Sequence, residues 1–263
     1  MASFIDVKRG NAPLLISVPH AGIELPAEVA KQVVSQELAI GDADWHMDRI
    51  YDFVLDMDAT MVKTAISRTA IDVNRDPSGA SLYPGQATTE LVPTTTFDGV
   101  PIYKPGCEPD ASEVERRRGA YFDPYHSALQ AEIDRLLAIH RRIVVYDCHS
   151  IRSVIPRLFE GELPVFNIGT NNGASADPGL TEIVRQACEA SEKPFVVNGR
   201  FRGGWITRHY GRPEQGVHAV QMELAQRIYM DEAKPGVIDP VRTEQAVTLL
   251  RPVLTAICHW IKT

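Results

Sequence analysis

Polar residues at the ends of predicted strands could together bind one metal ion. His20 follows the apolar run at residues 14–18 in SVPHAG, and His149 follows the run at 143–146 in YDCHS. In an open α/β sheet, sites form beyond the carboxyl ends of the strands. A lone His near a core is usually only hydrogen-bonded, but two at strand exits favour a divalent metal site. Hydrolytic zinc sites typically combine two His with one carboxylate and leave a fourth position for water.

The segment GDADWHMD could supply the carboxylate. It contains Asp42, Asp44 and Asp48, and the last two would share one face of a helix because they are four residues apart. Each of them could equally be a helix cap or a surface acid. His46 would point to a different helix face, and Glu24, close before a proline, is a weaker alternative.

Glu223 is the most unusual single residue. It lies between Met222 and Leu224 in HAVQMEL, a segment that predicts a mostly buried strand. An unpaired carboxylate is costly in such a place. Glu223 must therefore pair with a buried Arg or hold a working position with a raised pKa. As a general base that takes a proton from water, it would contribute roughly 10²–10⁴ in rate.

Two Arg-containing segments could bind an anionic substrate. In SRTAIDVNRDP, Arg75 can hold a carboxylate through two parallel bonds and Asn74 can donate another. The alternative is that Asp72 simply pairs with Arg75. The Gly-rich segment NGRFRGGWITRHYGRP adds further basic side chains: Arg200, Arg202, Arg208 and Arg212. Together with Arg68, these residues indicate a small anionic substrate beside a metal.

The elements that must position these residues alternate between strands and helices. Strands are predicted at 14–18, 61–66, 143–146, 164–168 and 217–224. Helices are predicted at 26–38, 44–57, 112–142 with a break or kink at Pro124, 178–191 and 240–261. Residues 76–109 are rich in Pro, Gly and Thr, and loops of that length are usually functional or disordered. The alternation predicts one α/β domain over residues 1–263, with a mostly parallel or mixed central sheet flanked by helices on both faces.

The charge balance excludes several classes of partner. The chain has 27 Lys and Arg against 34 Asp and Glu, a net charge of −7, which argues against nucleic acid and anionic membranes. No apolar run approaches the ~20 residues of a spanning helix, and the N-terminus lacks a hydrophobic signal region. The four cysteines form no CxxC pair. We expect a cytoplasmic protein with buried thiols, and with Arg116–Arg118 and Arg141–Arg142 on solvated helix faces.

Several long segments resemble one known family. SVPHAGIELP, GDADWHMDRIYDF, SRTAIDVNRDP, YDCHSIRSVIPRLFEG and NGRFRGGWITRHYGRPEQGVHAVQMELAQRIYMDE are similar to N-formylglutamate amidohydrolases, and more distantly to zinc exopeptidases and aspartoacylases. The resemblance extends from about residue 12 to 235. It implies a zinc-exopeptidase-like (phosphorylase/hydrolase-like) fold. It also implies zinc-dependent hydrolysis of N-formyl-L-glutamate to L-glutamate and formate, in histidine degradation.

The resemblance also implies a set of metal ligands. His20 and His149 match the two His that bind zinc in the distant relatives. Those relatives place the acidic ligand three residues after the first His, where this chain has Ile23. We therefore expect the acidic ligand to be Asp44 or Asp48.

The remaining site residues follow from the same resemblance. Asn74 and Arg75 match the pair that binds the substrate carboxylate, and Glu223 matches the base. The residues expected to contact substrate are Arg68, Asn74, Arg75, Arg202 and Thr207.

Three alternatives remain. Cys148 could be a nucleophile beside His149, although adjacent residues of a strand point to opposite faces. The substrate could be another N-acyl amino acid, such as N-formylaspartate or N-acetylaspartate. The chain could also bind a dicarboxylate without catalysis or a metal.

Overall fold

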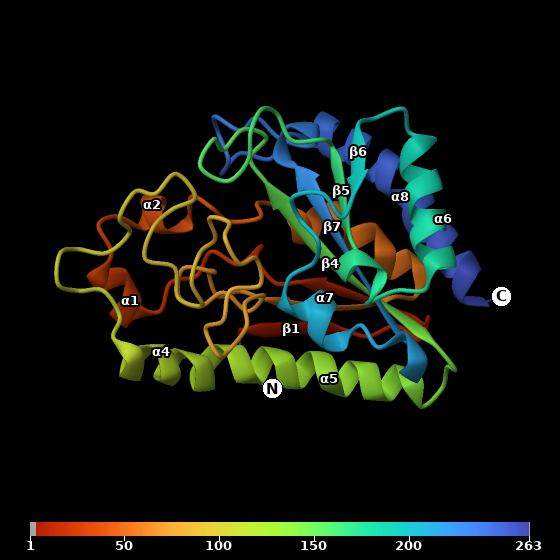
Figure 1. Cartoon of the computed structure of the whole chain (residues 1–263), viewed down its shortest axis with the longest axis horizontal. Helices are drawn as coiled ribbons and strands as arrows, with labels where there is room; N and C mark the ends of the chain where they lie inside the picture. The colour runs from red at the N-terminus through yellow and green to blue at the C-terminus, as the bar shows by residue number, and fades with distance from the viewer. Residues whose placement is uncertain (1–3, 263) are drawn as a thin grey trace.

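We describe residues 4–262 of the chain from a computed structural model, in which seven strands form one mixed sheet (Figure 1). The strands are β1 (Ile5–Lys8), β2 (Leu14–Val18), β3 (Thr60–Thr64), β4 (Ile143–Ile151), β5 (Phe166–Gly169), β6 (Phe195–Val197) and β7 (Val217–Ala225). Their order is β1-β3-β2-β4-β7-β5-β6. The central strands β3, β2, β4 and β7 are parallel, whereas β1 and β5 run antiparallel to β3 and β7.

Helices cover both faces of the sheet, which confirms the predicted fold class. One face packs against α3 (Met47–Ile50), η1 (Asp52–Met57), α6 (Pro178–Glu189) and α8 (Pro240–Lys262). The other face packs against α5 (Asp123–Leu137) and α7 (Trp205–Tyr210). In Figure 1, α4 (Ala111–Arg117) and α5 run end to end along this second side.

The central strands β4 and β7 are buried over all nine residues of each. Their side chains alternate between the two faces. Val144, Tyr146 and Cys148 of β4 belong to the core under α6 and α8, while Ile143 and Val145 belong to the core under α5. Continuing this alternation places Asp147 and His149 on the α5 side, at the carboxyl end of the sheet. Strand alternation therefore places Asp147 and His149 next to each other on one face, at the carboxyl end of the sheet.

Several expected helices are shorter or divided. The segment 26–38 forms α1 (Ala27–Gln32) and α2 (Gln36–Ile40), because Ser35 is extended and caps α2 by accepting from Leu38 N. The helix expected from Asp44 begins only at Met47, after His46 takes a left-handed conformation with φ of 60°. Both corrections involve local turns that side-chain periodicity does not reveal.

The long helix expected at 112–142 is continuous through Pro124. The π-helical segment η2 (Arg118–Phe122) joins α4 to α5, and Pro124 lies in the first turn of α5. Proline lacks the N–H that would continue the hydrogen-bond ladder, and the π-helical segment directly before it is where the ladder changes. The expected break at Pro124 is therefore absent, and the irregularity near it is the π-helical segment Arg118–Phe122.

Arg117 does not lie on a solvated face, contrary to the expectation for the basic run at 116–118. Its side chain is completely buried and donates to Glu113 Oε1 at 2.7 Å and to the Tyr103 hydroxyl at 2.8 Å. Arg116 and Arg118 remain near the surface. The Arg117 side chain thus links α4 to the irregular segment 76–109 through its bond to Tyr103.

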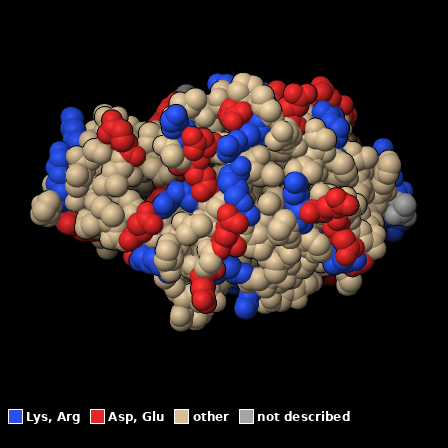
Figure 2. Space-filling model, turned by 90° about the horizontal axis from the view of Figure 1, so that it is seen from above, with Lys and Arg blue, Asp and Glu red and all other residues tan. Residues whose placement is uncertain are grey.

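The irregular segment 76–109 contains no helix or strand, as expected. The short strands β1 and β6 and helix α7 are unexpected, and β4 extends five residues beyond Tyr146. Short 3-10 turns complete the described chain: η3 (Asn171–Gly173), η4 (Pro213–Gln215) and η5 (Gln226–Ile228). Among residues 4–262, no helix combines the length and apolar character needed to cross a membrane. Basic and acidic side chains are interspersed over the face shown in Figure 2.

Candidate active site

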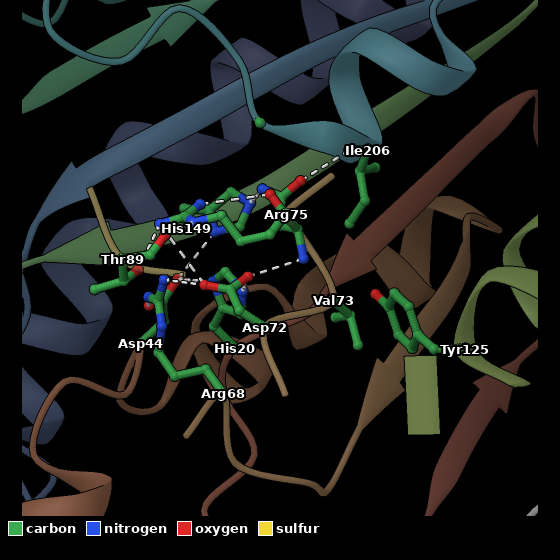
Figure 3. A network of polar contacts seen from close by, with 12 residues as sticks. His20, Asp44, Arg68, Asp72, Val73, Arg75, Thr89, Tyr125, His149 and Ile206 are labelled. Atoms are coloured by element: carbon green, nitrogen blue, oxygen red, sulfur yellow. Dashed lines mark hydrogen bonds and ion pairs between the residues drawn. The ribbon is translucent and has the colours of Figure 1, made fainter. Parts of the chain in front are cut away.

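Three buried side chains from separate parts of the chain converge at the carboxyl end of the sheet (Figure 3). His20 follows β2, Asp44 precedes α3 and His149 lies near the end of β4, with exposed fractions of 2%, 1% and 3%. One possible ligand atom from each lies within 4.8 Å of the others. The two imidazole centroids are 4.9 Å apart. This group, which we call the His–Asp–His cluster, can offer two nitrogen atoms and one oxygen atom to a single ion.

Two aspartates orient the imidazoles of the cluster. His20 Nε2 lies 2.7 Å from Asp72 Oδ1, and His149 Nε2 lies 2.8 Å from Asp147 Oδ2. Each Nε2 can therefore carry the proton and donate it to a carboxylate, which leaves the Nδ1 lone pair free. His20 Nδ1 is buried without a hydrogen-bond partner among the described residues. His20 Nδ1 thus faces the Asp44 carboxylate, while the Asp72 carboxylate holds the other side of the ring. A metal-binding His usually has such a carboxylate on its second nitrogen.

Asp44 is held in the cluster by several groups. Its backbone N–H donates to the His20 carbonyl at 3.0 Å, and its Oδ2 accepts from the backbone N–H of Ser150 at 3.1 Å. Its Oδ2 also lies 3.1 Å from His149 Nδ1 and 3.7 Å from His20 Nδ1. Arg68 donates to its Oδ1 at 3.3 Å.

Asp48 lies outside the His–Asp–His cluster. Its Oδ2 accepts from Lys63 Nζ at 2.8 Å, and its side chain is 31% exposed. The left-handed turn at His46 separates Asp44 from the helix that carries Asp48, so the two acids do not share one helix face. His46 itself contacts the Pro235 carbonyl through Nε2 at 3.0 Å.

Two glycines allow the backbone to pass close to the site. A Cβ on Gly22, just after His20, would lie 2.5 Å from the Ala65 carbonyl carbon. A Cβ on Gly204 would lie 2.4 Å from Asn74 Nδ2. Only glycine avoids both contacts, which gives a physical reason for the HAG and RGG sequences.

Charges around the cluster stabilise ionised carboxylates. Burial would raise the pKa of Asp72, but Arg75, His20 and Arg68 hold it well below its usual range. Burial similarly opposes ionisation of Asp44, yet His149 and His20 keep its pKa low. Burial would lower the pKa of His149, but Asp147 and Asp44 hold it well above its usual range. The ionised carboxylates thus favour a positive charge in the pocket. A divalent cation could supply that charge in place of the proton on His149.

Glu223 faces the same pocket from β7 and is 7% exposed. It is paired in register with His149 across β4 and β7. Burial raises the pKa of Glu223 to about 8, with Asp44 and Asp147 adding repulsion and with His149 and Arg68 opposing the shift. A carboxyl group with such a pKa can accept and return a proton near neutral pH.

The pocket above the cluster is small and partly covered by the irregular segment. Its volume is about 60 Å³. Its lining includes Tyr83, Thr88, Thr89 and Phe97 from residues 76–109, the apolar side chains Ile151, Leu158 and Phe201, and the guanidinium groups of Arg68, Arg75 and Arg200.

The residues expected to contact substrate differ in their surroundings. Arg75 lines the pocket, and its side chain donates to the Thr89 carbonyl at 3.1 Å. Asn74 also lines it, but its Oδ1 accepts from Ile206 N at 2.8 Å and its Nδ2 donates to Asp147 Oδ2 at 3.2 Å. Arg68 bridges Asp44 and Asp72.

Arg202 and Thr207 do not line the pocket. Arg202 is exposed, while Thr207 is buried and packs against Gly203. Arg200, two residues before Arg202, reaches the pocket instead. Sequence reasoning also missed the orienting role of Asp72 and Asp147. The alternation of β4 could have indicated Asp147, because residues 147 and 149 share one face.

Cys148 lies away from the pocket. Its side chain is buried in the core on the α6 and α8 side of the sheet, and burial raises the pKa of its thiol well above the ordinary value. A buried neutral thiol on the opposite face from His149 cannot form a nucleophile–base pair with it.

Comparisons with known proteins agree with this architecture. Residues 12–230 match the family model for N-formylglutamate amidohydrolase. The chain is 44% identical over 261 residues to N-formylglutamate deformylase of Pseudomonas aeruginosa, covering 99% of this chain and 98% of that protein. It is 43% identical to the Pseudomonas putida N-formylglutamate deformylase, covering 99% and 97%. The crystal structure of an N-formylglutamate amidohydrolase from Ralstonia eutropha shares the fold with a TM-score of 0.82 at 21% identity, over 98% of each chain. The chain therefore belongs to the N-formylglutamate amidohydrolase family.

Proposed function

We propose that this chain is a metal-dependent amidohydrolase that converts N-formyl-L-glutamate and water to L-glutamate and formate. The observation that carries the proposal is the buried His–Asp–His cluster beside Glu223, in a pocket lined by arginines. The 44% identity to a Pseudomonas aeruginosa N-formylglutamate deformylase supports the choice of substrate.

The proposed metal ligands are His20, Asp44 and His149. Two imidazoles with one carboxylate form a ligand set typical of zinc. The Nδ1 atom of His20 is buried without a hydrogen-bond partner, as expected for a nitrogen that binds a metal ion. When bound, a divalent ion would polarise the formyl oxygen and make water more acidic. Asp72 and Asp147 would fix the two imidazole rings for this role.

Glu223 is the proposed general base and acid. It takes a proton from the water that attacks the formyl carbon, and it returns that proton to the glutamate nitrogen as the C–N bond breaks. Formate and L-glutamate, with a free amino group, are then the two products. The buried position of Glu223 excludes bulk water that would otherwise compete for the proton.

Arg75 is the proposed contact for one substrate carboxylate, because its guanidinium lines the pocket next to Asp72. We assign Asn74 to the support of Asp147 and of α7, and Arg68 to the support of Asp44 and Asp72. Neither Arg202 nor Thr207 has a role in this proposal.

We further propose that residues 1–263 form one domain. We also propose that the protein acts in histidine degradation and that it does so in the cytoplasm. All seven strands of the described chain belong to one sheet. All four cysteines are free, as is usual in a reducing compartment.

The test is formate release from N-formylglutamate, N-formylaspartate and N-acetylaspartate, with acetate measured for the last. We expect N-formylglutamate to have the highest kcat/KM, chelation to abolish turnover and added zinc to restore it. Preference for an aspartate derivative would reassign the substrate. Binding of a dicarboxylate without turnover in the zinc-loaded protein would contradict hydrolysis.

A further inference from the structure

Arg200 is a pocket-lining cation without an acidic partner. Its Nε donates to the Leu158 carbonyl at 2.8 Å, and its Nη2 donates to the Ala87 carbonyl at 2.8 Å. Among residues 4–262, no Asp or Glu oxygen lies within 4.0 Å of its guanidinium nitrogens. Two neutral carbonyls fix the orientation of this charge without neutralising it.

The surroundings of Arg200 strengthen an interaction with an anion. The guanidinium carbon lies 5.5 Å from the Tyr83 ring centroid and 5.4 Å from that of Phe201. Leu158 adds an apolar wall. Partial burial lowers the pKa of Arg200, and the charge of Arg75 acts in the same direction, while Tyr83 and Glu223 oppose the shift. A half-buried, fixed guanidinium forms stronger bonds to a carboxylate than an exposed one.

Arg75 and Arg200 lie at different places in the pocket. Arg75 is within 3.7 Å of Asp72, which in turn contacts His20 of the cluster. Arg75 also donates to the Thr89 carbonyl and hydroxyl, whereas Arg200 is held by the carbonyls of Ala87 and Leu158. The pocket thus offers one cation that lies beside Asp72, next to the cluster, and a second one that only carbonyl groups hold.

This arrangement matches the two carboxylates of a formylated glutamate. The α-carboxylate is attached directly to Cα and stays close to the reacting formyl group, whereas the side-chain carboxylate lies beyond two methylene groups. We propose that Arg75 binds the α-carboxylate and that Arg200 binds the side-chain carboxylate, so that Arg200 determines specificity for an acidic side chain. The assignment of the two carboxylates rests on the proposed function.

The test compares Arg200→Met with Arg202→Met, using N-formylglutamate and its neutral analogue N-formylglutamine. For Arg200→Met we expect kcat/KM to fall about 10- to 100-fold with N-formylglutamate, the usual range for a charge-assisted bond. With N-formylglutamine the change should be less than about threefold. Arg202→Met, which alters an exposed side chain outside the pocket, should leave both substrates nearly unchanged. Arg200→Lys should retain part of the preference for glutamate.

A purely structural role for Arg200 gives a different result. If Arg200 only holds Ala87 and Leu158 in place, Arg200→Met lowers kcat/KM equally for both substrates, and that outcome overturns the proposal. Unchanged activity with N-formylglutamate would also overturn it. Thermal unfolding of both variants identifies any general loss of stability.

Binding separates this proposal from the proposed reaction. Calorimetry should show that the wild-type protein binds L-glutamate at least about 10-fold more tightly than L-glutamine, and that Arg200→Met removes the difference. Absence of formate release by the wild type would refute the proposed function alone. Equal binding of the two amino acids by the wild type would refute the role of Arg200.

Discussion

At the scale of residues, the site consists of imidazoles whose outer nitrogens are engaged by carboxylates. Asp72 holds His20 and Asp147 holds His149, so both Nδ1 atoms face Asp44. The orientation of His20 could not be assigned from sequence, because Asp72 lies in a different segment, whereas Asp147 precedes His149 by two residues on the same face of β4. The pairing explains why two buried His can coexist with three buried carboxylates.

Replacing Glu223 tests its role as the base. In Glu223→Gln we expect kcat to fall about 10²- to 10⁴-fold, because the amide cannot take a proton from water. Metal content should stay at one ion per chain, since Glu223 is not a proposed ligand. Formate release and elemental analysis on the same preparation measure both effects. Near-normal turnover in this variant would rule out the assignment.

A matched pair of aspartate variants tests the acidic ligand. Asp44→Asn should weaken zinc binding by at least about 10-fold, because it removes a charged ligand from the buried cluster. Asp48→Asn should leave zinc affinity unchanged, because Asp48 contacts Lys63 outside the cluster. Competition with a chromophoric chelator measures both affinities. Equal losses in the two variants would contradict the ligand set.

The pH dependence of catalysis should report Glu223. A general base acts in its ionised form, so kcat/KM should rise as pH increases through the pKa of Glu223. Burial raises that pKa to about 8 in the metal-free chain, and a nearby cation will lower it toward the ordinary value. The pH profile of Glu223→Gln should lack this rising limb. An identical limb in the variant would assign it to another group.

At the scale of elements, strand alternation explains the placement of the site. In β4 and β7, one set of alternate side chains forms the core under α5 near the start of each strand and becomes the polar site at its end. Apolar runs predicted the central strands well, because such strands are buried on both faces. The apolar run at 143–146 underestimated the length of β4. Asp147 and His149 interrupt the apolar pattern, but the backbone of β4 continues to pair with β7.

The parts that sequence did not predict are short elements, one local turn and side chains fixed by tertiary contacts. β6 has three residues and α7 has six. These lengths are too short to show the alternation of a strand or the 3.6-residue repeat of a helix. The left-handed turn at His46 separated Asp44 from Asp48. Arg200 rather than Arg202 reaches the pocket because partners on two distant segments, Ala87 and Leu158, fix its side chain. None of these partners is close in sequence.

Arg117 provides a test of how α4 is attached to the rest of the chain. Its buried guanidinium also donates to the Ala70 carbonyl and to Gln32, so Arg117→Ala leaves several buried acceptors unpaired. We expect a loss of about 3–5 kcal/mol in the free energy of unfolding. Arg116→Ala should cost less than about 1 kcal/mol, because Arg116 is 46% exposed. Urea denaturation measures both, and a similar cost for the two variants would contradict the account.

At the scale of the whole molecule, we expect substrate access to involve movement of the segment that lines the pocket from residues 76–90. A pocket of about 60 Å³ is far smaller than the roughly 300–1,000 Å³ of ordinary ligand sites. Tyr83, Ala87, Thr88 and Thr89 line it, and the Tyr83 hydroxyl donates to the Gly203 carbonyl at 2.9 Å. The segment is thus joined to the loop before α7 by a contact that can open without unfolding the sheet.

Hydrogen exchange should reveal this movement. In the described chain, residues 76–90 make short-range backbone bonds such as Gly79 to Asp76 and Gln86 to Tyr83, so their amides should exchange much faster than those of β4. Saturating L-glutamate should slow exchange in 76–90 and leave α8 unaffected. Mass spectrometry of peptides from each region measures both rates. Equal protection with and without L-glutamate would argue against closure of this segment on the ligand.

The most direct test of the account is the position of the metal in the active enzyme. A crystal of the zinc-loaded wild type, measured at wavelengths on either side of the zinc absorption edge, should show one strong anomalous peak bonded to His20 Nδ1, His149 Nδ1 and an Asp44 oxygen. The same measurement on His149→Ala, which should be inactive, should show the peak weakened or absent. A zinc peak elsewhere, or full turnover by protein without metal at these residues, would contradict the proposed site.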